Sequence, residues 1–444
     1  MIKIKRLGLA VVLSLTVLPC WAQRQWTLDE CVQYAQEHNI NIQQREVQLK
    51  NYELDCNTSQ NAWLPQVDAQ VGQQFSFGNY NATVGSMNGE QTSVNNNLAY
   101  TTGKFGFSMP VFNGFKIKNQ IQSDKFNLEA ASADLERARK DIGIRIATQY
   151  MQCLYYKSMT EVAQSQVDVS RKTLEKAQIL FEEGKRPASE KAQAEAILAS
   201  DQYELVKAEG QQRLALLDLA QLLNLTSAED FDIAVLDDVQ LPEIAENEQA
   251  MYESVVEAWP SVVYSKALIE KGKADIEIAC AAYYPSLSLV GYVSTFYVDF
   301  FNQDLGWGGF GTQFFNNNLN EVIGVHLNIP VFSRMQTRNR LSQAKFNLTD
   351  RQLALDEARL ALHNEIQTAY TNVSVAYDRY LSAMVAVEAA EVSVNYEQDR
   401  YDAGRGTIFD LQQSQQKHVA ALHDALQAKY EYLVRNRILD FYRK

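Results

Sequence analysis

Proline is scarce in this chain of 444 residues, and its absence from two long stretches limits what they can form. There are eight prolines, with none from residue 111 to 186 and none after residue 330. A proline in a helix interior costs about 3 kcal/mol, because it removes a backbone donor and clashes with the preceding turn. Each stretch can therefore be one helix, and about 70 residues at ~1.5 Å per residue would rise ~100 Å.

Residues that bind metals or form disulfides are also few. The chain has five cysteines and five histidines, and they form neither a Cys-x-x-Cys pair nor a Cys/His cluster, which argues against a zinc site. It also lacks a phosphate-binding loop and a glycine-rich dinucleotide motif. We therefore expect no enzyme activity, no cofactor and no metal. Four cysteines are predicted to be buried single thiols: Cys31, Cys56, Cys153 and Cys280.

Positive charge is in the minority, and long apolar runs are confined to the amino terminus. The 41 Lys and Arg residues against 54 Asp and Glu give a net charge of −13, which argues against a nucleic-acid partner. Residues 1–22 combine basic residues, a short apolar core and a Cys-x-Ala end, which predicts a signal peptide. A lipidated Cys20 is the alternative. No later stretch approaches the roughly 18 apolar residues of a membrane helix, so an exported chain of this kind could enter a membrane only through strands.

The chain does contain an internal repeat at a fixed offset of 220 residues. The matching positions include Pro65 with Pro285, Pro110 with Pro330, Val111-Phe112 with Val331-Phe332, and Lys125-Phe126-Asn127-Leu128 with Lys345-Phe346-Asn347-Leu348. Such self-similarity indicates a duplicated supersecondary unit. Each proline-free stretch begins with a strict seven-residue apolar repeat, which predicts left-handed coiled helices. The repeat positions are Ile121, Leu128, Leu135 and Ile142 in one copy, and Leu341, Leu348, Leu355 and Leu362 in the other.

Between the paired prolines the apolar period changes from seven to two. After Pro65, Val67, Ala69 and Val71 alternate with Gln and Asp residues, and similar alternation precedes Pro110. Alternation over about ten residues is typical of a strand that crosses an outer membrane with one apolar and one polar face. The alternative is that these segments are surface hairpins on a helical body.

Two polar loops, at residues 79–97 and 299–320, separate the expected strands. Aromatic residues in the second loop suit a membrane interface; they are Trp307, Phe310, Phe314 and Phe315.

One chain then supplies four strands, which cannot close a barrel, and an open edge in hydrocarbon leaves backbone groups unpaired at several kcal/mol each. Closure requires several chains: two would give eight strands around a filled bore, and three would give twelve around a lumen.

Several segments resemble the TolC-like outer-membrane efflux proteins. They include the opening Trp26-Thr27-Leu28-Asp29-Glu30-Cys31, the segment Pro110-Val111-Phe112-Asn113-Gly114, and the segment Tyr401-Asp402-Ala403-Gly404-Arg405-Gly406-Thr407-Ile408-Phe409-Asp410-Leu411. The resemblance covers essentially the whole mature chain. It implies a mainly α-helical fold with a β-barrel part: a homotrimer with a twelve-stranded barrel among outer-membrane lipids and a coiled helical tunnel across the periplasm. It also implies docking to a periplasmic adaptor protein and an inner-membrane pump.

With this family as the template, the chain divides into eight parts. They are a signal peptide (1–22), a first-repeat periplasmic helix (23–64), a first transmembrane hairpin (65–112), first-repeat tunnel helices (113–225), an equatorial segment (226–246), a second-repeat helix (247–284), a second transmembrane hairpin (285–332) and second-repeat tunnel helices (333–444). We expect an outer-membrane exit duct of a tripartite efflux or secretion system in a Gram-negative-type cell. Conduction is expected to be passive, with a gated periplasmic entrance. The alternative is a secreted structural or adhesive coiled-coil protein. The sequence leaves the exported substrate, the class of pump and the resting state of the gate open.

Two glycine-containing turns are the expected periplasmic tips of the tunnel. Asp410 lies six residues after Gly404, and Glu190 lies six residues after Gly184. The resemblance implies that Asp410 contributes to a constriction ring and that Glu190 helps to hold the gate shut. The alternative is that both acids only stabilise a helix N-terminus through its dipole, by about 0.3–1 kcal/mol.

The residues beside these acids complete the predicted site. A second family acid falls on Gln413, whose counterpart is Gln193, so any ring is expected to carry less charge than in the most acidic relatives. Lys185 and Arg405 directly follow the two glycines and are expected to pair with neighbouring acids, to latch the turns and to contact the adaptor. The gating arginine of the family matches Gly406, and glycine has no side chain that could form the latch of that arginine.

Replacing both acids by amides, Asp410→Asn with Glu190→Gln, is expected to weaken cation preference and block by multivalent cations. The physical reason is that a trimer would place up to six carboxylates near the tunnel entrance. Reversal potentials in asymmetric salt across a planar bilayer measure this preference. Unchanged selectivity in the double variant would contradict the ring, although not the channel.

Overall fold

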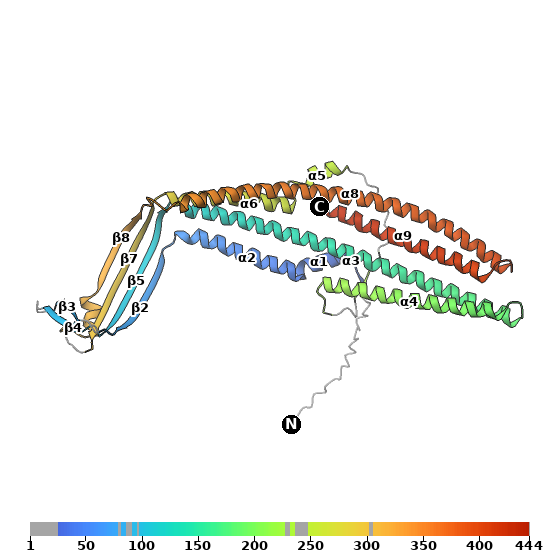
Figure 1. Ribbon diagram of the computed structural model, residues 1–444, viewed down its shortest axis with the longest axis horizontal. Coiled ribbons are helices and arrows are strands. Elements are labelled where there is room, and N and C mark those ends of the chain that lie inside the picture. Colours follow the sequence, from blue (N-terminus) through green and yellow to red (C-terminus); the bar gives the residue numbers. More distant parts are fainter. Residues whose placement is uncertain are drawn as a thin grey trace, which may run out of the picture. The chain divides into compact units, whose positions relative to one another are not determined.

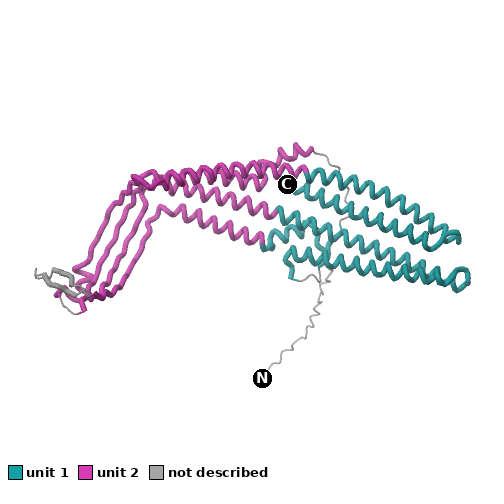
Figure 2. The backbone as a smooth tube through the Cα atoms, viewed as in Figure 1, with its two compact units in different colours: residues 1–40, 140–246, 368–444 teal, residues 41–139, 247–367 magenta. Residues whose placement is uncertain are grey.

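The computed structural model describes residues 25–78, 81–85, 91–95, 97–226, 231–235, 247–301 and 305–443. The predicted signal peptide with Cys20 and most of the predicted equatorial segment lie outside the described residues. The chain forms two compact units, each built from separate segments (Figure 2). Unit 1 comprises Met1–Ile40, Lys140–Glu246 and Thr368–Lys444, and unit 2 comprises Asn41–Arg139 and Asn247–Gln367.

Unit 2 contains one four-stranded antiparallel sheet (Figure 1). Its strands are β2 (Gln66–Ser76), β5 (Leu98–Asn113), β7 (Ser286–Phe300) and β8 (Asn320–Asn328), in the order β2-β5-β7-β8. Each predicted hairpin region thus contributes two strands. The two regions are joined because β5 pairs with β7 along nearly its whole length.

The strand register gives the sheet one apolar face and a second face that is mostly polar, although β7 also presents Val290 and Tyr292 there. One row across all four strands consists of Val67, Phe107, Gly291 and Ile323. A row three residues further along, on the opposite face, consists of Gln70, Lys104, Ser294 and Asn320. The apolar side chains are exposed, with Val71 79% and Ile323 78% accessible. Alternation in the sequence therefore agrees with the faces of β2, β5 and β8, whereas β7 alternates less cleanly and has apolar side chains on both faces.

The two segments predicted as polar loops contain more structure than the sequence indicated. The first carries a separate antiparallel pair, β3 (Asn81–Gly85) with β4 (Gln91–Asn95). The second begins only after β7 ends at Phe300, and it contains two short helical turns, α7 (Phe310–Thr312) and η3 (Gln313–Asn317). The Phe310 and Phe314 rings stack there with their centroids 4.9 Å apart.

Four helices of unit 2 continue the four strands and keep their order. They are α2 (Ile40–Gln60), joined to β2 by η1 (Asn61–Trp63); the start of α3 (Lys116–Glu182), after β5; α6 (Pro260–Cys280), joined to β7 by η2 (Ala281–Tyr283); and the start of α8 (Gln336–Asp402), after β8. Polar contacts join successive helices: Arg45 to Asp134 at 2.6 Å, Ser123 to Asp275 at 2.8 Å, and Arg351 to Asp275 at 3.3 Å. A short helix, α5 (Glu248–Val255), precedes α6.

The bounds of corresponding helices differ by 220 residues, the offset at which the sequence repeats. This holds for α2 with α6 and for α3 with α8. Both strand-to-helix turns also use two left-handed residues, Gly114 and Phe115 at one (φ 65° for each) and Arg334 and Met335 at the other (φ 48° and 64°). The same backbone turn thus forms with and without a glycine, although left-handed non-glycine residues cost on the order of 1 kcal/mol or more.

Unit 1 contains the second halves of the two long helices, α3 and α8, together with other helices. They are α1 (Leu28–His38), α4 (Ala188–Leu222), which lies beside α3, and α9 (Ile408–Arg443), which lies beside α8 (Figure 1). The Gln149 amide on α3 donates to the Ala215 carbonyl on α4 at 3.1 Å. The Ser393 and Ser414 hydroxyls join α8 to α9 at 3.0 Å.

The predicted state of the cysteines is largely confirmed. Cys31, Cys56 and Cys153 are buried free thiols, whereas Cys280 is only partly buried. Burial raises the pKa of Cys31 and Cys153 to about 12. Both thiols therefore remain protonated at neutral pH, as expected for inert packing residues.

Tyr150 fastens a short two-stranded sheet to α3. That sheet pairs β1 (Gln25–Trp26) with β6 (Asp232–Ile233) in parallel. The buried hydroxyl of Tyr150 lies 3.0 Å from the Trp26 carbonyl oxygen and 2.7 Å from the Ala234 carbonyl oxygen. One side chain thereby ties two distant segments to the helix.

Tyr150→Phe is expected to lower the free energy of unfolding by about 1–2 kcal/mol, because it removes the one hydroxyl proton that the Trp26 and Ala234 carbonyls share. Thermal unfolding of the purified full chain, followed by circular dichroism, measures the loss. Tyr203→Phe is the matched control, since Tyr203 is 67% exposed on α4 and should show no change. Equal effects of the two substitutions would contradict the fastening role.

Candidate functional site

The two predicted tip turns end α3 and α8 in the same way. Gly184 and Gly404 adopt left-handed conformations with φ of 68° and 73°. Their backbone N–H groups donate to the carbonyls of Phe181 at 2.9 Å and Tyr401 at 3.0 Å. A glycine just past a helix end is the usual way to reverse the chain without strain, and no atom lies near enough to Gly184 to give it a packing role. Both glycines thus serve the turn itself.

The two turns pack against each other through a small apolar core in unit 1. Its members come from α3, α4, α8 and α9: Ala177, Ala194, Ile197, Tyr401, Ile408 and Leu411. The tertiary structure therefore brings the two predicted tips, far apart in the sequence, into contact.

Glu190 and Tyr401 place two polar groups inside this core. Glu190 lies in the first turn of α4 with 8% of its surface exposed, and Tyr401 near the end of α8 is 3% exposed. Burial and the neighbouring Glu190 carboxylate raise the pKa of Tyr401 to about 12. Within the described residues, neither Glu190 Oε1 nor the Tyr401 hydroxyl completes a hydrogen bond of standard geometry. Tyr401 therefore keeps its proton at neutral pH and remains available as a donor to Glu190.

Three charged residues surround this pair. The Arg186 guanidinium approaches Glu190 Oε2 at 3.5 Å and lies 5.4 Å from the centre of the Tyr401 ring. The Lys176 ammonium forms an ion pair with Asp402 and lies 5.9 Å from the same ring. These five residues, Lys176, Arg186, Glu190, Tyr401 and Asp402, are termed the tip cluster below. The cluster joins the α3–α4 turn to the end of α8.

Asp410 is placed differently from Glu190. It is only partly buried in the first turn of α9, where Thr407 Oγ1 donates to Asp410 Oδ2 at 2.8 Å and accepts from the Asp410 backbone N–H at 3.2 Å. Thr407 thereby caps the start of α9, and Asp410 bonds to that capping side chain. A role in a constriction ring stays a prediction. Gln413 is exposed and Gln193 is partly buried.

The predicted latch residues lie outside the tip cluster. Lys185 pairs with Glu183 in its own turn at 2.8 Å, and Arg405 is exposed. Arg186, one residue after Lys185, is the cation that reaches Glu190. No pattern in the sequence distinguished it, because the choice between adjacent basic residues depends on the direction in which the turn presents each side chain.

The part of the chain that the structure describes offers little else for chemistry. No group of three or more His, Cys, Asp or Glu residues there is arranged to hold a metal ion. Among its helices, none is both long and apolar enough to cross a membrane.

Removing the cation beside the buried carboxylate should loosen the tip. Arg186→Gln is expected to cost this region about 1–3 kcal/mol, because Glu190 then stays buried without a charged partner. Hydrogen exchange of the amides in residues 180–190 and 398–410 should accelerate roughly 5- to 150-fold.

Lys185→Gln is the control, since its exposed ion pair should be worth at most about 1 kcal/mol. Equal acceleration in both variants would show that Arg186 contributes no more than a surface ion pair.

Comparison with known proteins matches most of the chain to one family. The model of the family described as outer membrane efflux protein matches residues 31–225 and 252–441. The pyoverdine export outer membrane protein OpmQ of Pseudomonas aeruginosa is 23% identical over 313 residues, which are 68% of this chain and 61% of OpmQ. The outer membrane efflux protein BepC of Brucella suis is 19% identical over 432 residues, 96% of this chain and 87% of BepC.

A solved structure shows that the fold is shared as well. The outer membrane protein VceC of Vibrio cholerae superposes with a TM-score of 0.73 at 16% sequence identity, covering 94% of this chain and 96% of VceC.

Proposed function

The chain belongs to the outer membrane efflux protein family, and from this premise we propose that it forms the exit duct of a tripartite efflux or secretion system. Membership places the chain in the outer membrane, in a family of channel proteins. In the proposed assembly a periplasmic adaptor docks at the tip turns, and an inner-membrane pump supplies the energy. Substrate then passes along the duct without any bond being made or broken.

The observation that carries this proposal is the four-stranded sheet with two open edges. β2 pairs only with β5, and β8 pairs only with β7, within the described strands. One face is apolar and exposed, as lipid contact requires, and the other is mostly polar, as a water-filled lumen requires. Since unpaired edges are not tolerated in hydrocarbon, further copies of the chain would pair β8 of one with β2 of the next. Three copies would give a twelve-stranded barrel.

The helices that continue the edge strands carry matching apolar stripes. On α2 the exposed residues Ile40, Val47 and Leu54 recur every seven positions, and on α8 Phe346, Leu353 and Leu360 do the same. Val47 is 57% exposed and Phe346 is 74% exposed in the single chain. A seven-residue apolar stripe is the seam of a left-handed coiled coil. These two stripes favour closure of a helical ring by the same copies that close the barrel.

The tip cluster and the first turn of α9 would then control the entrance. Arg186, Glu190 and Tyr401 hold the two turns of one chain together, so opening would require this packed contact to loosen. Asp410 and Glu190, with Gln413 and Gln193 one turn later, are proposed to lie near the constriction. Gly184, Lys185, Gly404 and Arg405 are proposed to contact the adaptor.

Single-channel conductance of the purified mature chain in a planar bilayer tests the duct. We expect discrete current steps with a preference for cations. Failure of a folded, assembled chain to insert would favour the structural or adhesive protein instead.

A charge in the α8 stripe is expected to prevent assembly. Leu353→Lys removes an apolar contact worth about 1.5–3 kcal/mol per copy and places a charge in the seam. The mass of the detergent-solubilised chain, measured by light scattering after size exclusion, should fall from that of a trimer to that of a monomer, and conductance should be lost.

Gln352→Lys adds the same charge at the neighbouring exposed position and should leave both the trimer mass and the conductance unchanged. A trimer that withstands Leu353→Lys would exclude this stripe from the interface.

A further inference from the structure

A cleft of about 750 Å³ lies in unit 2 where the sheet meets the helices. Its walls come from the ends of β5, β7 and β8, from α6, and from the starts of α3 and α8. Three cationic and four amide side chains line it: Lys116, Arg340, Arg351, Asn113, Asn328, Gln343 and Asn347. This composition is unusual in a chain whose net charge is −13.

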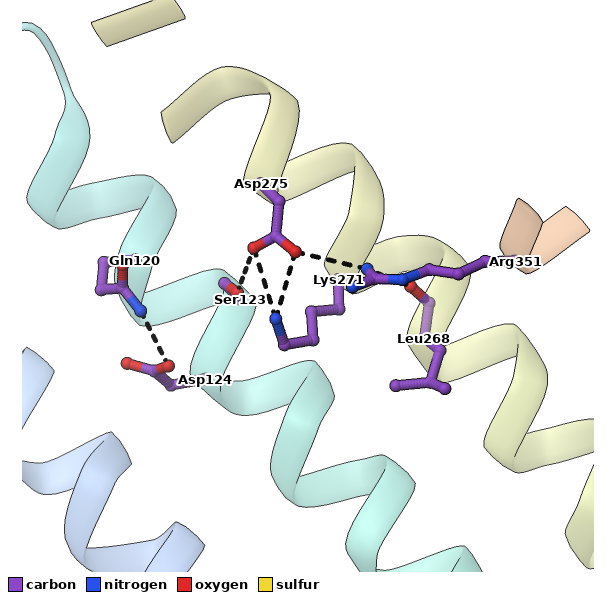
Figure 3. A network of polar contacts seen from close by, with 7 residues as sticks. All are labelled: Gln120, Ser123, Asp124, Leu268, Lys271, Asp275 and Arg351. Carbon is purple, nitrogen blue, oxygen red and sulfur yellow. Dashed lines mark hydrogen bonds and ion pairs between the residues drawn. The ribbon is translucent and has the colours of Figure 1, made fainter. Parts of the chain in front are cut away.

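The single acidic residue of the cleft is already neutralised. Asp275 accepts a hydrogen bond from the Ser123 hydroxyl at 2.8 Å and ion-pairs with Lys271 at 3.1 Å and Arg351 at 3.3 Å (Figure 3). Arg351 also donates to the Leu268 carbonyl at 2.9 Å. Two cations thus serve one carboxylate, and the cleft keeps a surplus of positive charge.

Gly272 allows Arg351 to take this position. A Cβ atom at residue 272 would lie 3.0 Å from Arg351 Nη1 and 3.2 Å from Leu348 Cδ1. The missing side chain therefore lets the guanidinium lie directly against α6. Arg351 is held in place at the edge of the cleft before any ligand arrives.

The other two cations remain without an acidic partner. Within the part of the chain that the structure describes, Lys116 and Arg340 form no ion pair, and both are exposed. The first turns of α3 and α8 also contain no acidic residue, although that is where helices favour acids. Lys116 and Lys118 stand instead in the first turn of α3. Cations at the positive end of a helix are unfavourable, and an anion in the cleft would offset this repulsion.

We propose that the cleft binds a phosphate group, with Lys116 and Arg340 as its charged ligands and the three Asn amides as further donors. Phosphate suits this set because it accepts several charge-assisted hydrogen bonds at once. By the alternation along β7 and β8, the cleft residues Ser286 and Asn328 belong to the polar face of the sheet. The phosphate belongs either to a solute inside the duct or to a lipid headgroup at the base of the sheet. Only this choice of source rests on the proposed function.

Titration calorimetry of the purified full chain with inorganic tripolyphosphate tests the site. The variant Lys116→Gln with Arg340→Gln should bind about tenfold or more weakly, since two charge-assisted bonds are lost. The control variant, Lys118→Gln with Arg338→Gln, removes the same charge from positions two residues away on the same helices that do not line the cleft. Binding weakened equally by both variants, or no binding by the unaltered chain, would overturn the proposal.

Two further measurements distinguish the sources of the phosphate. If the ligand is a headgroup, nanodiscs of phosphatidylglycerol should compete with tripolyphosphate, whereas nanodiscs of phosphatidylcholine should compete much less. If it is a solute, tripolyphosphate should reduce single-channel current in the control variant but not in the Lys116→Gln/Arg340→Gln variant. Calorimetry does not require conduction, so a chain that conducts without binding refutes this site alone. A chain that binds without conducting refutes the duct alone.

Discussion

The unpaired backbone at the edges of β2 and β8 is the constraint on which the rest of the molecule depends. A strand edge in hydrocarbon loses hydrogen bonds that water would otherwise supply, so the sheet of a single chain cannot be complete in a membrane. The exposed apolar face and the apolar stripes of α2 and α8 extend the same incompleteness from the sheet to the helices. Each of these features is costly in an isolated chain and favourable in a closed ring of copies.

Polar contacts keep the helices of unit 2 in the order of the strands. Apolar seams alone would allow neighbouring helices to slide, because leucine contacts are similar at successive turns. Asp275 bonds to Ser123 on one side and Arg351 on the other, and thereby fixes α6 between α3 and α8. Arg45 does the same for α2 through Asp134. Ordering these charged side chains costs free energy, but it holds the helices of unit 2 in a single register.

The two tip turns share a backbone but not a chemistry. At corresponding positions, Tyr401 is buried while Phe181 is 40% exposed, and Glu190 is buried while the partly buried Asp410 bonds to Thr407 at the start of its own helix. The asymmetry arises because the first turn supplies Arg186 to the shared core and the second supplies the tyrosine ring. Charge is also distributed unevenly along the chain: at the tip turns acids and cations pair, whereas the cleft in unit 2 carries a surplus of cations.

The sequence alone determined the long helices, the alternating strands, the two glycine turns and the family, because each depends on local periodicity or on short ordered motifs. It missed the β3–β4 pair, since strands of five residues are too short for a clear alternation. It also did not single out Arg186, the cation that approaches Glu190, and it gave no sign that β5 pairs with β7 or that Lys116 and Arg340 share a cleft. These facts were decided only by the tertiary structure. The physical reason is that packing against a segment hundreds of residues away decides which of several similar residues makes a contact. Such packing produces no periodic pattern in the sequence.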